Sequence, residues 1–442
     1  LLLRAKALYY QGEFQLSKGS LERLSSEFSG SPLLNEARLW TIRCQWKNES
    51  SKASLEETLY FIGELEKNDR FGRIQSLRSL AHTIASEIYQ FYGEIDSALT
   101  HLEKSAEYAA NRLDRMNAHY TIAARAYEEG RLNIALENYR KVISSHPNPK
   151  RVEMSHLQIV RIYRETKMWT EASEEIEELT TNEKFSNIKS DLSLELAKLY
   201  EMQGRDDEAR KRYEVITEDF PKTAASAESY FALGTAALDE EKDYPLARKY
   251  FDNVEREFRE STYAPSARVR VQEIDDLLSV TEAIEKVEVS LFGDGETKEG
   301  TEKTAISVDR LLNVDLKSSV KQEEEIENIT NESQDDIIDT TKLYQELSQQ
   351  LYSAGELQAF RFGDTEEGMK YFIRIVNNLP STNRTAQALY SLSYLYDISG
   401  DSVRASDLRN RLMIDYSDSE YAMEIARSQS MILADAPAEL MV

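Results

Sequence analysis

An internal repeat with a period of 37 residues constrains the fold of this chain more than any other feature of its sequence. A small residue marks each copy, and a large side chain follows it four positions later. The small residues are Ala98, Ala135, Ala172, Ala209 and Ala247, and the large ones are Leu102, Tyr139, Ile176, Tyr213 and Phe251. Periods of about 20–50 residues are typical of proteins in which one supersecondary unit stacks on the next.

The residues within one copy predict a pair of antiparallel helices. In the clearest copy, 116–149, Gly130 ends the first helix and Pro147 stops the second. Ala123 and Ala135 are small enough to let the two helices approach closely. The turn position is Gly93, Gly130, Lys167, Gly204 and Lys242 in successive copies. A heptad coiled coil is excluded, because glycine and proline interrupt the apolar pattern once per copy.

In residue type and spacing this unit resembles the tetratricopeptide repeat. The resemblance implies an all-α fold, an α-solenoid of antiparallel helix-turn-helix repeats. A second set of repeats lies near the C-terminus, where Gly368 and Ala405 are again 37 residues apart.

Residues 283–340 separate the two sets and are strongly acidic. They contain 16 Asp/Glu and 6 Lys/Arg, a net charge of -10. Such a segment buries too little apolar area to offset the entropy lost on ordering. We therefore expect an N-terminal solenoid over 1–282, a flexible acidic insert over 283–340 with a short strand at 287–291, and C-terminal repeats over 341–435. The insert is expected to be a solvated spacer, with docking of a basic partner as the alternative.

The ends of several second helices carry a finer resemblance. An aromatic residue or leucine is followed by proline or a polar residue and then by Ser/Thr. The segments are Phe220-Pro221-Lys222-Thr223, Phe258-Arg259-Glu260-Ser261, Leu379-Pro380-Ser381-Thr382 and Tyr416-Ser417-Asp418-Ser419. This pattern is similar to the repeats of bacterial cell-envelope proteins, namely the BamD-like outer-membrane assembly lipoproteins and the periplasmic partners of the Tol system. The resemblance implies a periplasmic or outer-membrane-associated location.

Composition restricts the partners. The net charge of -25 argues against nucleic acid and against an anionic membrane surface, since both are bound through Lys and Arg. Cys44 is the only cysteine, so no intramolecular disulfide can form. No apolar run is long enough to span a bilayer. The chain begins with Leu1 and not Met, so we expect the true start, and with it any signal peptide or lipid-attachment site, to precede it.

Three histidines share the repeat. His82, His119 and His156 are each 37 residues apart, near the start of a first helix. A zinc site is disfavoured, because neighbouring helix pairs stack about 10 Å apart, whereas zinc needs nitrogens at about 2.0–2.1 Å. No carboxylate was found in phase with them, so a half-buried packing role is expected. The sequence contains no phosphate-binding loop, nucleophile motif or paired catalytic carboxylates, and no cofactor or metal is expected.

The groove of the solenoid is the candidate site. In tetratricopeptide arrays the first helices line the concave side and hold extended peptide or helical segments of other proteins. The family's inward positions that we expect to bind a partner are Tyr120, Tyr127, Leu157, Arg161, Arg164, Leu194, Lys198 and Phe231. Aromatic rings give contact area, and a guanidinium group suits a carboxylate. The alternative is that these are ordinary helix residues, balanced by Glu165 and Glu201 beside them.

The expected function is that of a non-catalytic protein–protein interaction scaffold, a subunit of a bacterial periplasmic or outer-membrane assembly. A cytoplasmic adaptor or regulatory subunit is one alternative. Another is the non-catalytic part of an enzyme whose catalytic domain lies upstream of Leu1.

Overall fold

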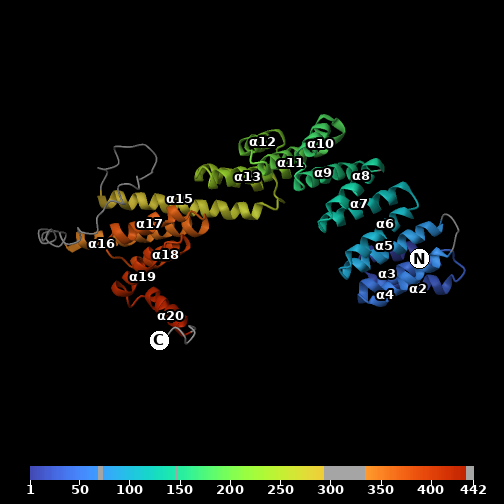
Figure 1. Ribbon diagram of the computed structural model, residues 1–442, viewed down its shortest axis with the longest axis horizontal. Helices are drawn as coiled ribbons and strands as arrows, with labels where there is room; N and C mark the ends of the chain where they lie inside the picture. The colour runs from blue at the N-terminus through green and yellow to red at the C-terminus, as the bar shows by residue number, and fades with distance from the viewer. Residues whose placement is uncertain (68–72, 146–147, 293–333, 435–442) are drawn as a thin grey trace. The chain divides into compact units, whose positions relative to one another are not determined.

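The computed structural model describes residues 1–67, 73–145, 148–292 and 334–434, and within these ranges the chain is helical and contains no strand. Its residues group into two compact units, Leu1–Pro221 and Lys222–Val442. The predicted all-α fold built from helix pairs is confirmed (Figure 1). No helix of the described ranges has the length and apolarity needed to cross a membrane.

The first unit consists of successive antiparallel helix pairs. Its helices are α1 (Leu2–Tyr10), α2 (Phe14–Glu27), α3 (Leu34–Glu49), α4 (Lys52–Glu66), α5 (Arg73–Phe91), α6 (Ile95–Glu107), α7 (Arg112–Glu128), α8 (Leu132–Ser145), α9 (Pro149–Glu165), α10 (Trp169–Thr181), α11 (Lys189–Met202) and α12 (Asp206–Asp219). A short 3-10 helix, Glu183–Ile188, precedes α11. We call α5, α7, α9 and α11 the first helices of their repeats, and α6, α8, α10 and α12 the second helices.

The repeated small residues lie where the two helices of a pair meet. Ala135 of α8 is fully buried beside Ala123 of α7, and Tyr139 is 2% exposed in the same cluster. Side chains of this size let two helix backbones approach closely, while the larger ring fills the remaining space. The alanines of the 37-residue repeat are therefore packing residues.

The turn position adopts a left-handed backbone in each repeat. Gly130 has φ +70°, and the lysines predicted to replace it, Lys167 and Lys242, have φ +59° and +55°. Glycine adopts this conformation without strain, whereas any other L-residue there costs about 1 kcal/mol. The predicted equivalence of these turn positions is confirmed.

The starts of α7 and α9 also follow the repeat. The side-chain oxygens of Asn111 and Asn148, 37 residues apart, accept hydrogen bonds from the backbone N–H groups of Asp114 and Arg151. Each bond satisfies one of the N–H groups that a helix N-terminus leaves without an intrahelical partner. The repeat thus specifies both ends of its first helix.

The second unit combines helix pairs with a long helix. Its helices are α13 (Ala224–Asp239), α14 (Tyr244–Glu257), α15 (Ala264–Phe292), α16 (Gln334–Glu356), α17 (Thr365–Asn378), α18 (Thr385–Ile398), α19 (Ser402–Asp415) and α20 (Glu420–Ala434). A π-helical segment, Leu357–Arg361, follows α16 directly.

Helix α15 corrects part of the predicted insert. Residues 283–292 belong to this helix, so the strand expected at 287–291 was wrong. Ile284 and Val287 of α15 pack with Leu347 and Leu351 of α16 in one apolar cluster. This packing joins the chain on both sides of the acidic segment into one unit, which is why the structure divides after Pro221 and not at the segment itself. Residues 293–333, the centre of the predicted insert, lie outside the described residues.

Candidate partner-binding surface

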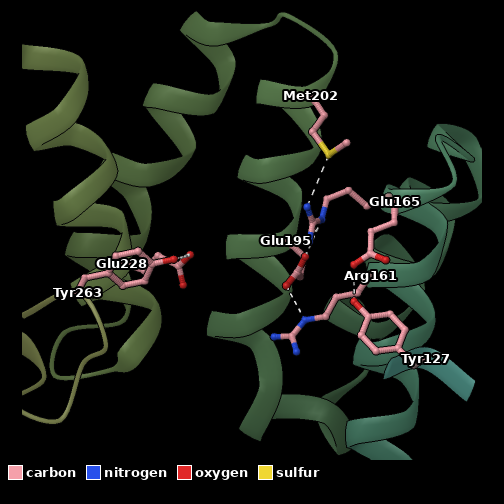
Figure 2. A network of polar contacts seen from close by, with 8 residues as sticks. Tyr127, Arg161, Glu165, Glu195, Met202, Glu228 and Tyr263 are labelled. Atoms are coloured by element: carbon pink, nitrogen blue, oxygen red, sulfur yellow. Dashed lines mark hydrogen bonds and ion pairs between the residues drawn. The ribbon is translucent and has the colours of Figure 1, made fainter. Parts of the chain in front are cut away.

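The predicted groove residues of the first unit lie on α7, α9 and α11, and polar bonds join these three first helices. The Tyr127 hydroxyl of α7 donates to the Glu165 carboxylate of α9. Arg161 and Arg164 of α9 both donate to the Glu195 carboxylate of α11. Figure 2 shows this network with Glu195 at its centre. The row of bonds holds side chains of consecutive repeats in fixed positions.

Glu195 is a buried carboxylate with two cationic partners. Its side chain is only 1% exposed, and its two oxygens accept from Arg161 Nε at 2.8 Å and from Arg164 Nε at 2.9 Å. A buried charge is tolerated only when it is paired and hydrogen-bonded. Because two guanidinium groups share one carboxylate, the trio carries a net charge of +1.

The pKa of Arg161 is raised above its ordinary value. Burial acts in the opposite direction, but the charge of Glu195 and its hydrogen bond outweigh it. The pKa of the Tyr127 hydroxyl is raised to about 12, first by burial and then by its bond to Glu165. Both groups therefore keep their protons at neutral pH, as donors in this network.

The structure revises the clamp expected from the sequence. The arginines were predicted to bind a partner's carboxylate, but each already binds Glu195 through Nε. The Nη1 atom of Arg164 also contacts the Met202 sulfur at 3.6 Å. For Arg161, Nε makes the hydrogen bond seen within the described part of the chain, and the charge of Asp191 also acts on this guanidinium group.

The other predicted residues lie in different surroundings. Leu157 and Leu194 are 2% and 4% exposed and belong to the core, so they do not line an open groove. The Tyr120 ring is half-buried, and the Arg151 guanidinium lies over it at 3.9 Å. Phe231 lies in the second unit, where its ring packs on Phe251 and Tyr263. Lys198 lies on α11 and is half-buried.

Sequence reasoning missed two members of the surface. Glu195 lies 34 residues after Arg161, and Met202, which is 45% exposed, lies 38 residues after Arg164. Both spacings are close to one repeat, so they mark residues of neighbouring first helices. A search for opposite charges at separations of 34 and 31 residues, somewhat less than one repeat, would have found Glu195.

The three in-phase histidines also differ from expectation. One of them has a carboxylate partner, since His156 Nδ1 lies 2.6 Å from Glu175 Oε1, but the equivalent positions beside His82 and His119 hold His101 and Asn138. Nevertheless, no group of three or more His, Cys, Asp or Glu suited to a metal ion occurs among the described residues. The zinc hypothesis therefore gains no support from these positions.

Comparison with known proteins agrees with this architecture. The tetratricopeptide repeat family profile matches residues 191–223, which begin in α11 and end just after α12. Residues 191–223 therefore match one tetratricopeptide repeat.

Several solved structures are similar to the chain. A tetratricopeptide repeat protein from Parabacteroides merdae is 14% identical, with 61% of this chain and 96% of that chain covered and a TM-score of 0.36. The C-terminal part of a repeat-containing protein from Cytophaga hutchinsonii is 13% identical, with 60% and 99% covered and a TM-score of 0.42. A Rap protein complexed with competence and sporulation factor is 11% identical, with 85% and 95% covered and a TM-score of 0.33. Among curated protein sequences, none matches this one.

Proposed function

We propose that the chain is a non-catalytic scaffold that binds a segment of another protein along α7, α9 and α11. The observation that carries the proposal is the state of Arg161. Its guanidinium group is held in place by the buried Glu195 carboxylate through Nε, while its side chain remains 31% exposed. A donor that is already immobilised loses little conformational entropy when it binds a partner.

The neighbouring side chains indicate the chemistry of the partner segment. Met202 offers a flexible apolar surface, and the half-buried Tyr127 offers the face and edge of a ring. An extended or helical segment with an apolar side chain next to a carboxylate or carbonyl group fits this combination. Because the network exists before binding, the partner meets a preformed surface.

Replacing Arg161 tests the proposal without damaging the fold. In Arg161→Ala, Arg164 still pairs with Glu195, so the buried charge keeps a partner. Arg212→Ala on second helix α12 is the matched control, because no bond of that side chain occurs among the described residues. We expect a tagged full chain with Arg161→Ala to copurify at least about ten-fold less of its bound protein, and Arg212→Ala to retain it. Equal recovery in both variants would contradict the proposal.

The double variant Arg161→Ala/Arg164→Ala is a poor test of binding. It would leave the buried Glu195 carboxylate without a cation, and the resulting loss of stability would lower partner recovery for an unrelated reason. A thermal unfolding curve for each variant separates the two effects, because Arg161→Ala should keep the wild-type transition within a few degrees.

We further propose that the scaffold serves a periplasmic or outer-membrane assembly of a bacterial cell envelope. The support is the sequence at the ends of its second helices, such as Phe220-Pro221 and Leu379-Pro380, which resembles that of envelope repeat proteins. Fractionation of host cells that express the complete gene tests this location. Recovery in the periplasmic or outer-membrane fraction supports it, and recovery in the cytoplasm favours an adaptor or regulatory subunit instead.

A further inference from the structure

Each in-phase histidine of the first helices meets a second-helix residue 19 positions later. His82 Nδ1 lies 2.9 Å from His101 Nδ1, and His119 Nδ1 lies 2.9 Å from Asn138 Oδ1. The third contact is the one from His156 to Glu175. The three partners are themselves 37 residues apart. One place in the repeat therefore carries three different pairings, in which the partner is an imidazole, an amide and a carboxylate.

The His82–His101 pair is the most enclosed of these contacts. His82 has no exposed surface, and the two ring centroids are 5.1 Å apart. Tyr108 stacks on His82 with centroids 5.6 Å apart, and Tyr89 stacks on His101 at 5.2 Å. The pair joins α5 to α6 inside a stack of four rings.

A hydrogen bond between two Nδ1 atoms requires one of them to carry hydrogen and the other to lack it. His82 Nε2 is buried and has no hydrogen-bond partner among the described residues. If His82 accepted the bond, its proton would sit on Nε2 as an unsatisfied buried N–H group. If His82 donates, only a lone pair is left unsatisfied, which is the less costly state. The geometry therefore assigns the Nδ1–H tautomer to His82 and the Nε2–H tautomer to His101.

We propose that the His82–His101 pair is an acid-sensitive latch between α5 and α6, closed while both rings are neutral and opened by protonation. The first added proton places a charge in the ring stack. A proton on His101 Nδ1 places an N–H on both facing nitrogens, so the 2.9 Å contact can no longer form. A proton on His82 Nε2 leaves this contact in place but puts a charge on a buried ring. Opening the contact separates the two helices of this repeat.

Most of the surrounding charges also disfavour protonation of the two rings. Lys104 of α6 and Arg78 of α5 lie near His82, and both disfavour a further positive charge. Near His101, Lys104 acts likewise, and Glu66 at the end of α4 is the one opposing group among those that act on its pKa. Helices α3 and α7 pack on α5 and α6, respectively. Within the described residues, they supply none of the charges that act on either ring. Among these groups, Glu66 is therefore the one that favours a protonated ring.

The pH range follows from the pKa of His82. Burial, and then His101 and Lys104, lower this pKa from 6.5 to about 4. The unfolded chain takes up a proton near pH 6.5, whereas the closed latch does so only near pH 4. The stabilising effect is complete above pH 6.5 and is lost as the pH falls from 6.5 to 4. At pH 4.5 this shift of the His82 pKa, which includes the effect of His101, should favour opening by about 50-fold relative to pH 7.

Amide hydrogen exchange of the full chain at pH 7.0 and pH 4.5 tests the latch, after correction for the intrinsic pH dependence of exchange. We expect protection in α5 and α6 to fall about 50-fold more than in α9 and α10. The latter pair is an internal control, because protonation strengthens its His156–Glu175 contact. Equal losses in the two helix pairs of the wild-type chain would overturn the proposal.

Two substitutions of His101 reproduce the pairings found in the neighbouring repeats. His101→Glu gives His82 the partner that His156 has, and the excess acid sensitivity of α5 and α6 should disappear. Should this variant be unfolded at pH 7, His101→Asn copies the His119–Asn138 pairing and should lose less protection than wild type. The charge of His101, which contributes to the lowered pKa of His82, is then gone, and a protonated His82 can still donate to the amide oxygen. Wild-type acid sensitivity in a folded variant of either kind would overturn the proposal.

Discussion

Replacing Glu195 by alanine is expected to destabilise the first unit by about 3 kcal/mol, because it removes the carboxylate that Arg161 and Arg164 share. Arg164, with an 18% exposed side chain, would then hold a largely buried charge without a partner. Urea unfolding followed by tryptophan fluorescence measures this change. The chain's three tryptophans, Trp40, Trp46 and Trp169, all lie in the first unit, so the signal reports on that unit alone.

Two further variants show whether the loss comes from unpaired charge. Arg161→Ala should cost only about 1 kcal/mol, since Arg164 remains paired with Glu195. Glu214→Ala, an exposed glutamate on α12, should change the stability by less than about 0.5 kcal/mol. If Glu195→Ala costs no more than Glu214→Ala, the buried ion network does not stabilise the unit.

Replacing Gly368 by alanine is expected to destabilise the second unit by about 2 kcal/mol. A Cβ atom on Gly368 would lie 2.5 Å from the Ala359 Cβ and 2.8 Å from the Ala359 backbone nitrogen. Relieving such an overlap requires the backbone to shift, at a cost of about 3 kcal/mol, against a gain of about 1 kcal/mol from helix propensity. Amide hydrogen exchange in α17 and α18 measures the change, and tryptophan fluorescence should stay at its wild-type value because the second unit contains no tryptophan.

The physical reason lies in the π-helical segment Leu357–Arg361, which contains Ala359. Gly368 occupies the position that holds alanine in the other repeats, including the fully buried Ala405. The segment brings the Ala359 backbone so close to α17 that no side chain fits. The reverse change, Ala405→Gly, should lower the free energy of unfolding by about 1 kcal/mol. Its cause is the lower helix propensity of glycine, since no atoms overlap at that position. Unchanged stability in Gly368→Ala would contradict this prediction, because it would show that the π-helical segment can move away from α17 without loss of stability.

The repeat architecture could be predicted because its signals are local. Ala135 and Gly130 each act within one helix pair, so residue type and spacing specify the contact and the turn. The same local reasoning failed at residues 287–291. Their alternating valines favoured a strand, but Ile284 and Val287 lie on the helix face that packs against α16, which is distant in the sequence. A tertiary contact therefore decided the local structure.

The candidate site could be predicted only in part, because both sides of a first helix are covered. Leu157 was assigned to the groove, yet it packs in a cluster with Ile176 of α10 and Leu192 of α11, that is, with its own repeat and the next. Helix α9 buries a wide arc, and Arg161 and Arg164 are among its partly exposed residues. The side chains of both arginines are partly exposed, at 31% and 18%, but their main partner, Glu195, belongs to the following repeat and was not recognised.

The most direct test of the scaffold function is site-specific photo-crosslinking from the proposed surface. A photoreactive phenylalanine analogue in place of Met202 on α11 lies beside Arg164, and the same analogue in place of Val215, 38% exposed on α12, lies on a second helix. With the full chain expressed in its host, the account predicts a discrete protein adduct from position 202 and none from position 215. No adduct from position 202, or the same adduct from both positions, would contradict the claim that α7, α9 and α11 bind the partner.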